Sequence, residues 1–169
     1  GGAPKSADML NPEAVESFIR NTHERYYRHL REYFGNTVIA IFTDEPAILG
    51  RCAREDMIAW SGGLWEEFQE AGGCAGDLYL LFEKKDSQEK RRAQEIYQKV
   101  IYQRMSASYY ARLAGWCHAH GIGLIGHPEK STDIGYLQYF DIPCQDIVWR
   151  FVGPEEGKGI CGEHSTMAK

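Results

Sequence analysis

A unit of helix, glycine, apolar strand, polar residues and proline occurs twice in the sequence, and it constrains the fold more than any other feature. In the first copy, Asn11-Pro12-Glu13 is typical of a helix start, and apolar residues at helical spacing predict a helix over residues 12–34 that ends at Gly35. A strand is predicted next, over residues 37–43, and it runs into Asp44-Glu45-Pro46. The strand is apolar and β-branched throughout, so we expect it to be covered on both faces, as in a parallel sheet.

The second copy repeats this order of elements. It predicts a long helix over residues 87–120, which ends at Gly121, and a strand over residues 122–126, which leads into His127-Pro128-Glu129. Because strands that alternate with helices form parallel sheets, we expect an α/β fold with the polar residues gathered at the carboxyl edge.

The rest of the chain is less regular. Residues 54–60 and 63–70 resemble short helices between glycine-rich breaks. A third strand is predicted over residues 146–150, after a loop that contains Pro143. Three strands cannot close a barrel, which takes eight strand and helix pairs and typically about 250 residues. Either the chain belongs to a larger barrel, or a small sheet stands alone.

Composition narrows the classes of function. The chain has 169 residues, 43% of them hydrophobic, and a net charge of −5 with acids and bases interspersed, so we expect no nucleic-acid partner. No apolar run approaches the roughly 20 residues of a membrane helix, and we expect no membrane partner. The five cysteines are widely spaced without a Cys-x-x-Cys pair, which favours free thiols in a cytoplasmic setting. The compartment stays open if the chain is cut from a longer precursor.

The sharpest chemical feature is Asp44-Glu45 at the end of the first strand. A carboxyl group at the mouth of a sheet is partly removed from water, which favours its protonated form and suits a proton donor to a glycosidic oxygen. Alternation along the strand places Asp44 on the other side, where it would orient a neighbour or contact substrate. The alternative interpretation is a solvated pair that caps the following loop.

His127 and Glu129 end the second strand, and alternation predicts that both lie on one face. They could bind sugar hydroxyls, or Glu129 could supply a second catalytic carboxylate. Trp149 would offer a platform for a sugar ring, and Arg150 a partner for carboxylates or hydroxyls. The same acids and imidazole could bind a divalent cation, but their spacing fits no metal motif, so we assign no metal and no cofactor.

With Phe42-Thr43-Asp44-Glu45-Pro46 preceded by the helix that begins at Leu10-Asn11-Pro12, the chain resembles bacterial (β/α)8-barrel glycoside hydrolases, in particular enzymes similar to the α-L-rhamnosidases. The likeness runs from about residue 8 to the end and includes Gly126-His127 and the segment 146–149. It implies that residues 1–169 are a single fragment of a TIM-type barrel, about strands four to six with long flanking helices. Residues 1–10 would be an amino-terminal extension and residues 163–169 the start of a truncated helix.

The resemblance also implies roles. Glu45 would be the acid/base glutamate at the end of the fourth strand, with Glu129 ending the fifth and Trp149 the sixth. In many related barrels the second carboxylate ends the seventh strand, which would lie beyond Lys169, so the isolated chain would be incomplete and inactive unless Glu129 takes that part. Asp44 stands where many relatives have Asn, a departure that puts its exact role in doubt.

We therefore expect a carbohydrate substrate and hydrolysis of an O-glycosidic bond. Two other classes of function stay open: a non-catalytic carbohydrate-binding or scaffold module, and a metal-assisted hydrolase. An incomplete barrel exposes strand edges and apolar sheet faces, so we also expect the isolated chain to associate with itself.

Overall fold

The computed structural model describes residues 7–50, 54, 56–130 and 132–144, and they form two compact units. The sheet unit comprises residues 17–47 and 110–144, and the helical unit comprises residues 7–16 and 48–109.

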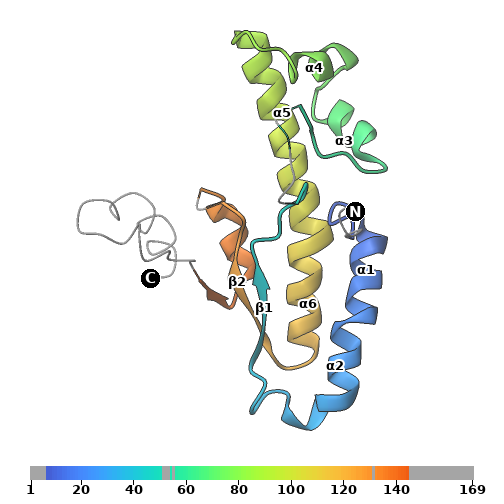
Figure 1. Cartoon of the computed structure of the whole chain (residues 1–169), viewed down its shortest axis with the longest axis vertical. Helices are drawn as coiled ribbons and strands as arrows, with labels where there is room; N and C mark the ends of the chain where they lie inside the picture. Colours follow the sequence, from blue (N-terminus) through green and yellow to red (C-terminus); the bar gives the residue numbers. More distant parts are fainter. Residues whose placement is uncertain (1–6, 51–53, 55, 131, 145–169) are drawn as a thin grey trace, which may run out of the picture. The chain divides into compact units, whose positions relative to one another are not determined.

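The sheet unit contains three parallel strands in the order β1-β2-β3. Strand β1 spans Ala40–Asp44, β2 spans Gly123–His127 and β3 spans Ile142–Pro143 (Figure 1). The register places Asp44 opposite His127 at the carboxyl ends of β1 and β2. The expected α/β fold with a parallel sheet is therefore confirmed.

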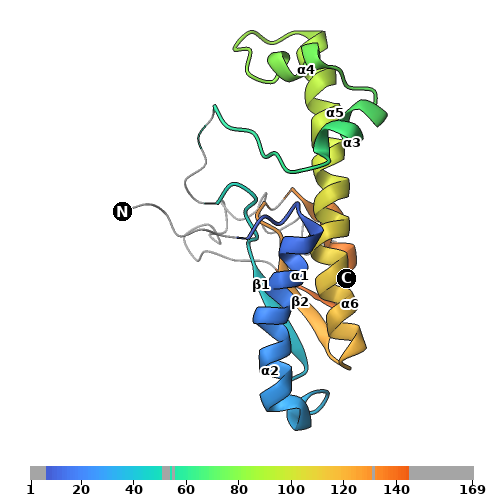
Figure 2. The same ribbon diagram turned by 90° about the vertical axis from the view of Figure 1, so that its right-hand side faces the viewer.

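Within the described part of the sheet unit, helices cover one face of this sheet. Helix α6, Ala111–Ala119, packs against β2, whose Leu124 is fully buried, and both ribbon views place α6 beside the strands (Figures 1 and 2). On the other face Phe42, Ile125 and Ile142 stand side by side in register. Phe42 is 53% exposed and Ile142 46% exposed. The prediction that the first strand is covered on both faces is wrong, because within the sheet unit the described helices lie on one side and leave Phe42 exposed.

The first predicted helix is broken. Helix α1 spans Pro12–Asn21, α2 spans His23–Leu30, and a 3-10 turn, η1, spans Arg31–Tyr33. The expected start is present, since the Glu13 amide donates to Asn11 Oδ1 at 2.9 Å. The break falls at Thr22, a β-branched residue that forms helices poorly.

Strand β1 begins three residues later than predicted. The amides of Thr37 and Val38 both donate to the carbonyl oxygen of Tyr33, so these residues close a turn after the helix and do not enter the ladder. Gly35 takes the left-handed conformation, φ +79°, that the predicted helix stop requires.

The second predicted helix is confirmed as a helical run. It consists of α5, Gln88–Met105, a π-helical segment, Ser106–Tyr110, and α6. Ser87 caps the run by accepting the Lys90 amide at 3.1 Å. Gly121, with φ +69°, ends it where predicted. The π-helical segment, which the sequence did not predict, is a short insertion of wider helix within the run.

Two short helices precede α5 in the helical unit: α3, Leu64–Glu70, and α4, Ala75–Leu80. The prediction of a helix over 63–70 is confirmed. The prediction over 54–60 is wrong for the residues described there, which form a turn and extended chain, with the Ala59 carbonyl accepting from the Tyr97 hydroxyl. Helix α4 was not predicted; Asp77 starts it by accepting the Cys74 amide at 2.8 Å.

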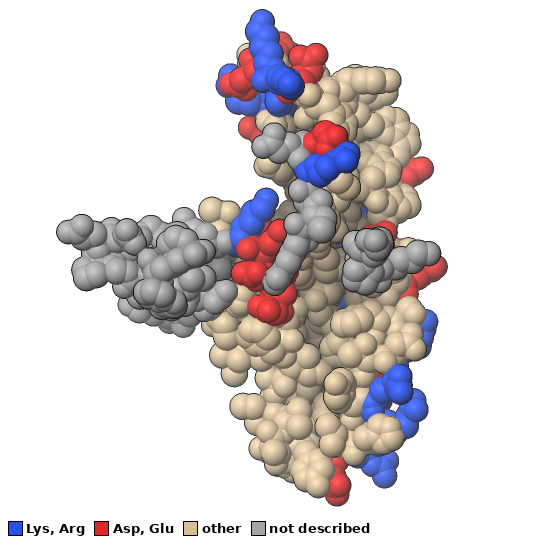
Figure 3. Space-filling view, viewed as in Figure 1, with Lys and Arg blue, Asp and Glu red and all other residues tan. Residues whose placement is uncertain are grey.

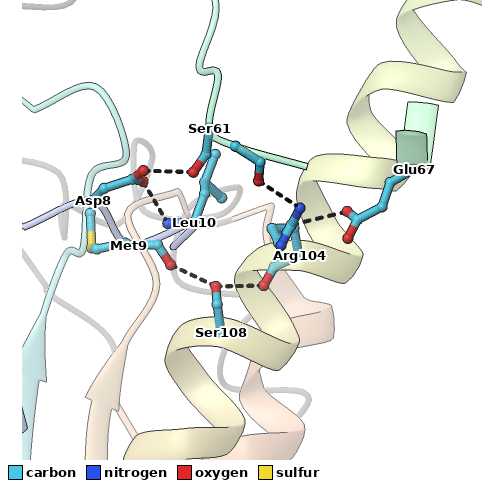
Figure 4. Close-up of polar contacts among 8 residues, drawn as sticks. Asp8, Met9, Leu10, Ser61, Glu67, Arg104 and Ser108 are labelled. Atoms are coloured by element: carbon cyan, nitrogen blue, oxygen red, sulfur yellow. Dashed lines mark hydrogen bonds and ion pairs between the residues drawn. The ribbon is translucent and has the colours of Figure 1, made fainter. Parts of the chain in front are cut away.

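A cluster of polar contacts joins three segments of the helical unit: residues 8–9, the loop before α3, and the helical run that includes α5 (Figure 4). Arg104 donates to Glu67 at 3.0 Å and to the Gly62 carbonyl at 3.1 Å. The Ser108 hydroxyl lies 2.6 Å from the Met9 carbonyl oxygen, and Ser61 donates to Asp8. Residues 8–10 of the expected amino-terminal extension thus pack within the helical unit.

The sheet unit contains a short third strand that the sequence did not predict. A 3-10 helix, η3, spans Ile134–Tyr139, and β3 follows it directly. Pro143 was expected in a loop but belongs to β3, where a two-residue edge strand tolerates proline. The strand predicted over 146–150 lies outside the described residues. None of the helices in the described ranges is both long enough and apolar enough to cross a membrane.

Candidate functional site

The carboxyl ends of β1 and β2 bring together two of the predicted site residues. Asp44 Oδ1 lies 3.4 Å from His127 Nε2. The Asp44 side chain is 66% exposed, whereas His127 is only 5% exposed. This contact therefore joins a buried imidazole to a carboxylate that reaches water, on the face of the sheet that helices leave uncovered.

The imidazole of His127 is held on three sides. Its Nδ1 lies 3.3 Å from the carbonyl oxygen of Pro128, its Nε2 faces Asp44, and the Phe42 ring meets it edge-on with centroids 5.9 Å apart. A carbonyl oxygen can only accept, so the contact at Nδ1 is a hydrogen bond when that nitrogen carries the ring proton. His127 Nε2 is the nitrogen that faces Asp44.

Glu45 has an unusual backbone. Its φ is +41°, and it is the only described residue other than glycine with a positive φ. A left-handed conformation at a residue with a Cβ costs on the order of 1–3 kcal/mol and persists only when neighbours enforce it. Here the strand pairing of Asp44 lies on one side and buried Pro46 on the other. Such strain is concentrated at functional sites, which makes Glu45 the strongest candidate of this edge.

Glu129 lies just beyond the same edge and is exposed. Strand β2 ends at His127, so the alternation that was expected to place His127 and Glu129 on one face does not extend to Glu129. Among the described residues, no hydrogen bond or ion pair joins Glu45 or Glu129 to another side chain. Both carboxylates are thus available to a ligand.

Acidic side chains gather over the ends of β1 and β2, and uncharged surface continues from them along the strands (Figure 3). Asp44 and Glu129 are exposed here and Glu45 is half-buried. The other two predicted site residues, Trp149 and Arg150, lie outside the described residues.

Sequence reasoning missed two residues at this edge. Gly126 allows β1 and β2 to approach closely just before the Asp44–His127 pair, and its place directly before His127 was the available signal. Cys144 follows β3 and donates its amide to the Gly126 carbonyl at 2.8 Å. It was missed because the third strand was predicted over 146–150.

The described residues contain no group of three or more His, Cys, Asp and Glu side chains that could hold a metal ion. Asp44 and His127 offer two ligands, and His118 and Asp141 form another pair of this kind, with Nε2 and Oδ2 2.9 Å apart. The assignment of no metal and no cofactor stays a prediction. No protein-family model, no curated protein and no solved structure matches the chain.

Proposed function

We propose that this chain is the part of a (β/α)8-barrel glycoside hydrolase that carries its general acid, Glu45. The observation on which the proposal rests is the backbone of Glu45, held in a left-handed conformation at the carboxyl end of a parallel strand, directly after the Asp44–His127 pair. In parallel sheets with helical crossovers, substrates bind at this edge.

The uncovered sheet face supports the barrel. In a (β/α)8 barrel the helices form an outer ring and the inner face of the strands is filled by apolar side chains. The row Phe42, Ile125 and Ile142 fits such an inner layer, and α6 fits the outer ring. Strands β1 and β2 would then be the fourth and fifth of the barrel, as the resemblance to the rhamnosidase-like enzymes implies.

In the proposed reaction, protonated Glu45 donates its proton to the oxygen that links the sugar to its leaving group. The bond between that oxygen and the anomeric carbon then breaks. A second carboxylate either attacks the anomeric carbon or activates water, and carboxylates about 5 Å apart give retention whereas about 6.5–9.5 Å gives inversion. The two candidates for the second catalytic carboxylate are Glu129 and the acid that the resemblance implies beyond Lys169.

The test compares leaving groups in the full-length protein. Glu45→Gln should lower kcat/KM about 100-fold or more for alkyl glycosides, starting with α-L-rhamnosides, because their leaving oxygen needs a proton. It should change kcat/KM little for 2,4-dinitrophenyl glycosides, whose leaving group departs unprotonated. Glu70→Gln, at an exposed residue that ends α3, is the matched control and should leave both values unchanged.

An equal loss for both classes of leaving group would exclude Glu45 as the general acid. Sugar binding without turnover in the unaltered full-length protein would favour a carbohydrate-binding module instead. For residues 1–169 alone, the uncovered face should drive dimers or larger assemblies in light scattering. A clean monomer would count against the barrel.

A further inference from the structure

The sequence predicts that His127 binds substrate, but the surroundings of this side chain indicate a different role. The imidazole is almost fully buried, with Phe42 against its edge and both nitrogens facing protein oxygens. A side chain with neither nitrogen left over has no free donor or acceptor for a sugar hydroxyl.

From this geometry we infer that His127 is a positioning residue: through Nε2 it holds the Asp44 carboxylate, and through Asp44 it holds the strained backbone of Glu45. The inference rests on the proposed function. For Asp44 the sequence allowed two roles, contact with substrate or orientation of a neighbour. In this inference Asp44 has the second role.

The chemistry of the contact is specific. Nε2 of His127 faces Asp44 Oδ1 at 3.4 Å, while Nδ1 lies 3.3 Å from the Pro128 carbonyl oxygen. A proton on Nε2 makes the contact with the carboxylate attractive, whereas an Nε2 without a proton offers Asp44 only a lone pair.

The consequence for Glu45 follows from the chain. Asp44 is the last residue of β1, and the next residue turns into the left-handed region. A backbone in that region relaxes when its neighbours stop enforcing it. If the Asp44 side chain loses its contact with His127, the end of β1 beside Glu45 loses one restraint, whereas the strand pairing and buried Pro46 remain.

The kinetic test uses two His127 variants of the full-length protein. His127→Phe keeps the ring against Phe42 but removes the donor, and it should lower kcat on the order of 10- to 100-fold with KM nearly unchanged. His127→Gln can place an amide donor near the position of Nε2 and should recover much of that loss. If His127 instead binds the sugar, KM rises in both variants while kcat holds, and the inference is overturned.

A double-mutant cycle asks whether His127 acts through Asp44. Asp44→Ala and the double variant Asp44→Ala/His127→Phe should have the same kcat, since the second change removes a contact that no longer exists. Additive losses would overturn the inference. Glu45→Gln separates this result from the proposed function, because wild-type activity of that variant on alkyl glycosides defeats the proposed function whatever His127 does.

A readout without turnover uses the ring nitrogens of His127. In ¹⁵N-labelled protein, long-range ¹H–¹⁵N spectra should show that Asp44→Ala changes the chemical shift of His127 Nε2 more than that of Nδ1, because only Nε2 faces Asp44. An Nε2 shift that Asp44→Ala leaves unchanged would overturn the inference. Circular dichroism of each variant confirms that the chain is folded before the spectra are compared.

Discussion

A Cβ on Gly126 would lie 2.0 Å from the carbonyl oxygen of Thr43. No rotation of a side chain can relieve that contact, because the atom in the way belongs to the backbone of the neighbouring strand. The φ of Gly126, +143°, is also a value that residues with a Cβ rarely adopt. The close pairing of the two strands that carry Asp44 and His127 therefore requires a residue without a side chain at position 126.

Gly126→Ala should therefore separate the ends of β1 and β2 and lower the free energy of unfolding by about 2–4 kcal/mol, at the upper end of overpacking costs. Gly115→Ala is the matched control. Gly115 lies in α6 with nothing within 4 Å of its added Cβ, so the same change should stabilise the helix by up to about 1 kcal/mol. Urea unfolding of both variants measures the difference, and equal effects would contradict the strand contact.

Glu45 offers a separate measurement of backbone strain. Glu45→Gly keeps the positive φ without a Cβ, and it should raise the free energy of unfolding by roughly 0.5–1 kcal/mol, the left-handed penalty less the entropy cost of glycine. Glu45→Ala loses the same carboxylate but keeps the strain, so it should not be stabilised. If both variants unfold at one urea concentration, the backbone at this position stores no strain.

His23 should make stability depend on pH. Burial lowers the pKa of His23 below 6.5, although neighbouring Glu24 acts in the opposite direction, and Nδ1 has no hydrogen-bond partner among the described residues. As pH falls below about 6.5, the unfolded chain takes up a proton that the folded chain refuses, so the free energy of unfolding should decrease until the folded pKa is reached.

His23→Phe keeps the ring contacts with Phe18 and Trp116, whose centroids each lie 5.2 Å from His23, and removes the titration. Its unfolding free energy should fall less steeply between pH 6.5 and pH 5. His29→Gln changes an exposed histidine of the same helix and should leave the slope as it is. The same slope in His23→Phe as in the unaltered chain would show that His23 is not the responsible group.

The thiols should differ sharply in reactivity. Burial, with the charge of Asp141 as a lesser cause, raises the pKa of Cys117 to about 11, whereas Cys74 is exposed. Since the thiolate is the reactive form, iodoacetamide should label Cys74 in the folded chain and Cys117 only after unfolding. Mass spectrometry of the labelled peptides reads out each site, and rapid labelling of Cys117 without denaturant would contradict its burial.

Local chemistry made much of this fold predictable from the sequence. Asn11 and Ser87 start helices by accepting amides a few residues away, and Gly35 and Gly121 end them with positive φ. The parallel pairing of the two predicted strands followed from their alternation with helices, and it brought Asp44 and His127 to one edge. Each of these signals lies within a few residues of the feature it predicts.

What the sequence did not predict depends on contacts between distant segments. The exposure of Phe42 follows from the placement of helices on one face only, and no pattern within residues 37–43 records which face that is. The burial of His127 depends on Phe42 and Asp44 from another strand. The position of β3 depends on its backbone pairing with β2. The short sequence of β3 has little strand propensity of its own.

The half-covered sheet also determines how much heat the chain absorbs on melting. Phe42 and Ile142 already touch solvent in the folded state, so unfolding hydrates less new hydrocarbon than it would in a chain of this length with a fully enclosed sheet. The heat-capacity increment of unfolding should accordingly be smaller than for the enclosed sheet, and it should rise when a binding partner covers the face.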